Sequence, residues 1–111
     1  MTLVLAPGTS FRTLCVALVG VGFHRETVSG GDEPRMAGFV RPGRSARRGE
    51  GRIVAVFNPA NGLRLLQLVG DAEAHGDAVR AALPIADAAM IAAATDPRWA
   101  AAATVALASG G

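Results

Sequence analysis

The stretch RIVAVFNPANGLRLLQLV, residues 52–69, decides the fold. Two apolar runs rich in β-forming residues flank residues 58–62, NPANG. Pro59 fixes φ at the second position of a turn, and Asn61 or Gly62 can adopt the positive φ that closes it. Two such runs joined by a five-residue connection predict a β-hairpin.

Both faces of this hairpin are largely apolar. In the first strand, Ile53, Ala55 and Phe57 point to one face, and Val54 and Val56 point to the other. In the second strand, Leu63, Leu65 and Val69 share one face, and Leu66 and Leu68 share the opposite one. A hairpin with one solvated face alternates apolar and polar residues, so this one should be covered on both sides. Helices of this chain can shelter one face. We therefore expect Val54, Val56, Leu66 and Leu68 to need cover from a partner or a second copy.

The segment before the hairpin begins with a short β-like run over 2–6, ended by the turn signal Pro7-Gly8. Thr9 or Ser10 can then cap a helix. Apolar residues recur at helical spacing in this segment: Phe11, Leu14, Cys15, Leu18 and Val21. Its β-branched residues favour a strand instead: Thr13, Val16, Val19 and Val21. We expect a helix here and leave the strand as the alternative.

Strands are also predicted over 23–29 and 36–41. Three helical segments follow Gly70, namely Asp71 to about Leu83, Asp87 to about Ala94, and Asp96-Pro97 to Ser109. The order is β-α-β-β-β-β followed by two or three short Ala-rich helices. Strands followed by helices indicate an α+β domain with a small antiparallel sheet, the helices packing on one sheet face. We expect a single domain over 1–111, with 1–70 mainly β and 71–111 helical.

Composition limits the class of protein. The 111 residues are half apolar, which predicts a folded chain. All 11 basic residues are arginine, a bias typical of GC-rich bacterial genomes. The single cysteine, Cys15, excludes an internal disulfide or a cysteine-based structural zinc site. Pro7 and Arg12 interrupt the apolar N-terminal run, so we expect neither a signal peptide nor a membrane span, and a cytoplasmic protein.

Charge is segregated along the chain. Six arginines and one glutamate between residues 35 and 52 give that segment a net charge of +5. The candidate contact residues are Arg41, Arg44, Arg47, Arg48 and Arg52. Their guanidinium groups suit an acidic protein surface or nucleic-acid phosphates, while a merely solubilising loop has the same pattern. No aromatic residues alternate with these arginines, so base stacking is unsupported.

No catalytic constellation is visible in the sequence. His24 and Glu26, two positions apart on an expected strand, could offer two metal ligands, but no third ligand can be named. His75 lies in a polar segment that we expect to be exposed. No catalytic residue, metal ligand or cofactor is predicted.

These observations favour a non-enzymatic protein-interaction or structural accessory module of bacterial type. It would contact a protein partner or another copy of itself through an apolar sheet face and the Arg-rich loop. Two alternatives stay open. The first is a nucleic-acid-binding accessory protein that uses the 35–52 arginine cluster, and the second is a small-molecule or metal-dependent enzyme.

Overall fold

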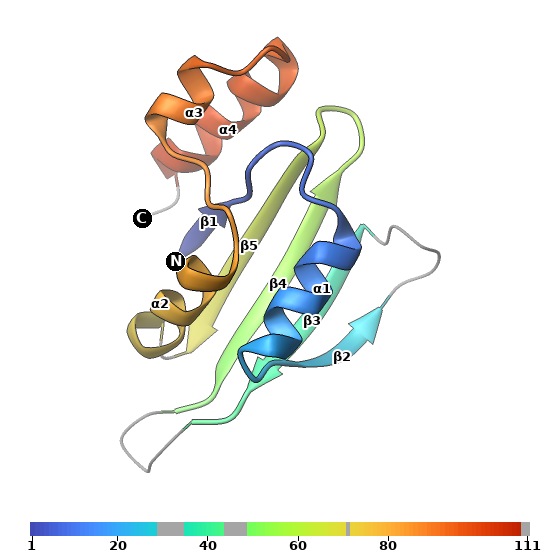
Figure 1. The fold of residues 1–111 in the computed structure, drawn as a ribbon, viewed down its shortest axis with the longest axis vertical. Coiled ribbons are helices and arrows are strands. Elements are labelled where there is room, and N and C mark those ends of the chain that lie inside the picture. Colours follow the sequence, from blue (N-terminus) through green and yellow to red (C-terminus); the bar gives the residue numbers. More distant parts are fainter. Residues whose placement is uncertain (29–34, 44–48, 71, 110–111) are drawn as a thin grey trace.

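The computed structural model describes residues 1–28, 35–43, 49–70 and 72–109. Its elements, in chain order, are β1 (Thr2–Val4), α1 (Phe11–Gly20), β2 (His24–Val28), β3 (Met36–Arg41), β4 (Gly51–Asn58), β5 (Leu63–Gly70), α2 (Ala72–Ala82), α3 (Ala88–Ala92) and α4 (Pro97–Ser109). The strands form one antiparallel sheet in the order β1-β5-β4-β3-β2 (Figure 1). The expected α+β class and element order are confirmed.

The central hairpin closes through the turn chemistry of its five connecting residues. The Asn58 side-chain oxygen accepts from the Ala60 amide at 2.9 Å, and that of Asn61 accepts from the Leu63 amide at 3.0 Å. Gly62 adopts φ +71°, so the glycine and not Asn61 supplies the left-handed residue. The turn sets an uninterrupted register between β4 and β5, from Asn58 opposite Leu63 to Gly51 opposite Gly70.

Local capping fixes the helices. The Ser10 hydroxyl accepts from the Thr13 amide at 3.1 Å and begins α1, so the helical interpretation of this segment is confirmed. Asp87 caps α3 through the Met90 amide at 2.8 Å. Asp96 accepts from the Arg98 amide at 2.9 Å, with Pro97 as the first residue of α4.

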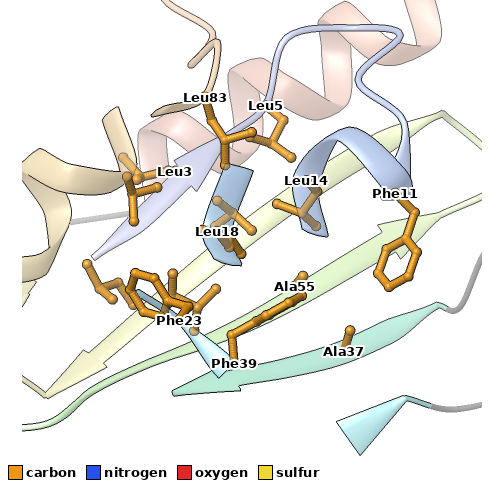
Figure 2. Close-up of a cluster of buried hydrophobic side chains, with 14 residues drawn as sticks. Leu3, Leu5, Phe11, Leu14, Leu18, Phe23, Ala37, Phe39, Ala55 and Leu83 are labelled. Atoms are coloured by element: carbon orange, nitrogen blue, oxygen red, sulfur yellow. The ribbon is translucent and has the colours of Figure 1, made fainter. Parts of the chain in front are cut away.

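One face of the sheet, which we call the covered face, carries α1 and α2 (Figure 1). Figure 2 shows Leu14 and Leu18 of α1 above Phe39 and Ala55 of the sheet. Leu66 and Leu68 are on this same face and are 0% and 3% exposed. The expectation that this chain leaves these two leucines without cover was therefore wrong. Their side chains point the same way as those of Ile53 and Ala55, which oppose them in the register.

The opposite side of the sheet, which we call the open face, is partly occupied by α4. Val4 and Leu65 are register partners and point away from the covered face, because they alternate with buried Leu3 and Leu66. The cluster on this side joins strand residues to α3 and α4 through Val4, Leu63, Ala86, Trp99, Ala103 and Ala106. The C-terminal helices thus divide between two faces and do not all pack on one. Both faces are apolar where β1 meets β5, so each attracts a helix.

Candidate interaction surfaces

The two described members of the predicted arginine contact set make internal contacts. The Arg41 guanidinium lies over the Phe23 ring at 5.9 Å, and its Nη1 is 3.5 Å from Nδ1 of His75. Arg52 forms ion pairs with Glu26 at 2.9 Å and Glu50 at 3.1 Å. Arg44, Arg47 and Arg48 lie outside the described residues. Of the five arginines, the structure thus describes only Arg41 and Arg52, and it places them with different partners.

His75 is buried, at 3% exposure, which corrects the expectation that its segment is exposed. It belongs to α2 and packs against Gly51 of β4, where an added Cβ would collide with the imidazole ring. Its Nε2 donates to the Gly49 carbonyl at 3.0 Å, which leaves Nδ1 to accept from Arg41. The Phe23 ring contacts the imidazole edge to face. His75 thus holds α2 to both strands that flank the arginine-rich loop.

The candidate metal pair is not a site in the described structure. His24 and Glu26 are both exposed, and the Glu26 carboxylate is engaged by Arg52. A bulge between Arg25 and Thr27 shifts the β2 register beside them. In the part of the chain that the structure describes, no three His, Cys, Asp or Glu side chains lie close enough to share a metal ion.

The open face keeps an apolar row that crosses three strands. Met36, Val56 and Leu65 are register partners on β3, β4 and β5. Met36 is 55% exposed, and Val54 and Val56 are half-buried. The described strand residues of the α4 cluster come from β1 and β5, so α4 covers only one side of this face. Val54 and Val56 are thus only partly covered by this chain, as the sequence led us to expect.

A groove runs between α4 and β5 on the open face, with a volume of about 580 Å³. We call it the α4 groove. It is lined by Asn61, Leu63, Leu65, Arg98, Ala101, Ala102, Val105 and Ala106. Val105 is 68% exposed, and no ion pair engages Arg98 among the described residues. The groove is apolar with one positive charge, which suits protein contact and offers no acid–base or nucleophilic chemistry.

A second groove, the α1 groove, lies between α1 and the β2 edge of the sheet. It has a volume of about 510 Å³ and is lined by Cys15, Val16, Val19, Gly20, Arg25 and Phe39. Sequence reasoning missed this surface. The available signal was Val16 and Val19, β-branched residues three positions apart that lie off the expected buried stripe of the helix.

Comparisons with known proteins give no functional information. No protein-family model matches the chain, and neither curated proteins nor solved structures provide a match. Among the described residues, no helix combines the length and apolar character required to cross a bilayer. The fold and its two grooves are thus the basis for assigning a function.

Proposed function

We propose that this protein is a non-enzymatic interaction module that binds an amphipathic helix of a protein partner on its open face, beside α4. The observation that carries the proposal is the apolar row Met36–Val56–Leu65 next to a groove that one helix already borders. A bacterial, cytoplasmic setting is part of the proposal and rests on composition.

The geometry favours a helix as the occupant. α4 already packs Ala103 and Ala106 against the β1–β5 side of the same face. Its side toward the groove presents Ala101 and Ala102, whose small side chains allow a neighbouring helix to approach closely. A partner helix parallel to α4 would continue the layer over Val56 and Met36. This is the helix-in-groove mode of recognition, with apolar anchors at helical spacing.

Charge narrows the choice of partner. Arg98 borders the α4 groove and pairs with no carboxylate among the described residues. The partner helix should therefore carry an Asp or Glu at the edge of its apolar stripe. Burying about 400 Å² of apolar surface would contribute about 10 kcal/mol before the cost of association.

The arginine-rich loop remains a separate prediction. From the sequence, Arg44, Arg47 and Arg48 are predicted to contact either an acidic partner surface or nucleic-acid phosphates. Salt-dependent binding to generic DNA or RNA distinguishes these two kinds of partner. The nucleic-acid alternative predicts binding at about 50 mM salt, with a salt dependence that falls by about 2 to 3 in slope when the three arginines are replaced by alanine. Undetectable binding at that salt concentration excludes this alternative.

The proposal is tested by photo-cross-linking the full chain in its native cells. A photoreactive residue at position 105 should cross-link to one partner, and the cross-linked peptide should belong to an amphipathic helix with an acidic residue. The matched control is position 107 on the same helix, since Leu107 does not border the groove. A cross-linked product with the mass of two copies of this chain would replace the partner with a second copy. Equal cross-linking at both positions would refute a specific surface.

A further inference from the structure

The two edges of the sheet differ in their protection. Beside β1, the segment around Ile85 acts as cover: the Ala6 amide donates to the Pro84 carbonyl at 2.9 Å, and the Ala86 amide donates to the Val4 carbonyl at 2.7 Å. At the other edge, β2 pairs with β3 on one side only. No described segment pairs with its outer side. The outward N–H and C=O groups of β2 are therefore available to another strand.

The helix above this edge exposes aliphatic residues. α1 buries Phe11, Leu14 and Leu18 on the covered face of the sheet. Val16 and Val19, one turn apart, are 67% and 59% exposed and border the α1 groove. The helix thus has a second apolar stripe, which faces the open edge instead of the core. A strand added to β2 would place alternate side chains against this stripe.

The α1 groove also has a defined charge. Arg25 lines the groove, since its register partner Phe39 belongs to the covered face. No carboxylate pairs with Arg25 among the described residues, whereas the carboxylate of the neighbouring Glu26 forms an exposed ion pair with Arg52 on the opposite face. The groove therefore presents two valines and one guanidinium group. Its complement is a strand face with aliphatic side chains and one carboxylate.

A second copy of this chain does not provide that complement. β2 has five residues, with Glu26 in the middle. If β2 paired along its full length with β2 of a second copy, in antiparallel orientation, the two-fold axis would pass through Glu26. Two Glu26 carboxylates would then lie opposite each other, and like charges in that position destabilise a strand pair. The charges and the bulge on β2 disfavour pairing with unselected strands as well.

We infer that β2 and the α1 groove bind an extended segment of a partner protein, which adds to the sheet as a sixth strand. Its aliphatic side chains at alternate positions contact Val16 and Val19, and a carboxylate on the same strand face pairs with Arg25. This surface is separate from the α4 groove and takes a strand instead of a helix, so the inference does not depend on the proposed function.

The test uses a library of random 12-residue peptides displayed on phage. Peptides are selected on the intact protein and depleted on the Val16→Glu variant. The native fold of each variant is verified by Trp99 fluorescence, because this single tryptophan is buried. Enriched peptides should share aliphatic residues at alternate positions and an Asp or Glu in step with them. The bound peptide should shift the backbone amide resonances of β2 and protect them from hydrogen exchange.

Charge and position are then tested with single variants. Arg25→Glu should weaken the selected peptides by at least roughly tenfold and favour their Glu→Lys counterparts. The matched control is Val69→Glu, since Val69 is an exposed valine on β5, which β4 and β3 separate from β2 in the sheet order. It should leave binding unchanged. Each of three results would overturn the inference. The first is that no peptide is enriched, and the second is that the enriched peptides lack alternating aliphatic residues or an Asp or Glu. The third is that the Arg25→Glu variant binds the selected peptides as tightly as the intact protein.

Discussion

Replacing Gly51 with alanine should destabilise the protein through a single neighbour, the buried ring of His75. A Cβ at position 51 points at the imidazole, which must then move away from β4. Overpacking of this kind costs about 1–3 kcal/mol. Displacement also strains the hydrogen bonds of His75 to Gly49 and Arg41, each worth about 1 kcal/mol. Alanine regains about 0.5–1 kcal/mol over glycine in a strand. The expected net loss is about 2–3 kcal/mol.

A double-mutant cycle with His75→Ala isolates this contact. Without the imidazole ring, Gly51→Ala should become stabilising by about 0.5–1 kcal/mol, so the coupling energy should be about 3 kcal/mol. Urea unfolding followed by Trp99 fluorescence provides all four free energies, because Trp99 is 2% exposed in the folded state. An equal effect of Gly51→Ala in both backgrounds would refute the contact between α2 and β4.

Three further predictions concern the backbone, the buried tryptophan and a surface ion pair. Gly70→Ala should cost more than about 2 kcal/mol in urea unfolding, because Gly70 has φ +93° and an added Cβ would meet the Glu50 carbonyl. Trp99→Phe should cost less than about 1.5 kcal/mol in unfolding followed by circular dichroism, since it removes a buried indole N–H that has no hydrogen-bond partner among the described residues. A larger loss of stability would show that the packing volume of the indole ring outweighs the cost of burying its N–H. Arg52→Ala should lower stability by less than about 1 kcal/mol, since its ion pair with Glu26 is exposed. A loss above 2 kcal/mol would contradict that estimate.

The parts of the fold that sequence alone could predict are those encoded locally. The hairpin follows from residues 58–62, and three of the helix starts follow from Ser10, Asp87 and Asp96. Each depends on hydrogen bonds between residues at most three positions apart. The α+β class then follows from the order of elements, because short connections between strands indicate antiparallel neighbours.

The rest of the structure depends on contacts between distant residues. His75 belongs to a polar segment, and it is buried by contacts with residues distant in sequence, namely Phe23, Arg41 and Gly51. Both faces of β1 are apolar in sequence, so the pattern cannot tell which of them receives α4. The same holds for the interaction surfaces. Val16 lies off the expected buried stripe of its helix, but that it borders a groove beside β2 appears only once α1 is placed over the sheet.

The position of β1 has a consequence for the order in which the chain folds. This three-residue strand is held between β5 and the segment at Ile85, and its Val4 also contributes to the α4 cluster. Its neighbours lie more than sixty residues further along the chain, so docking requires closure of a very long loop. The β4–β5 hairpin, by contrast, can form outward from its own turn, because its paired residues are close in sequence. We therefore expect the central hairpin to form before β1 docks between β5 and the segment at Ile85.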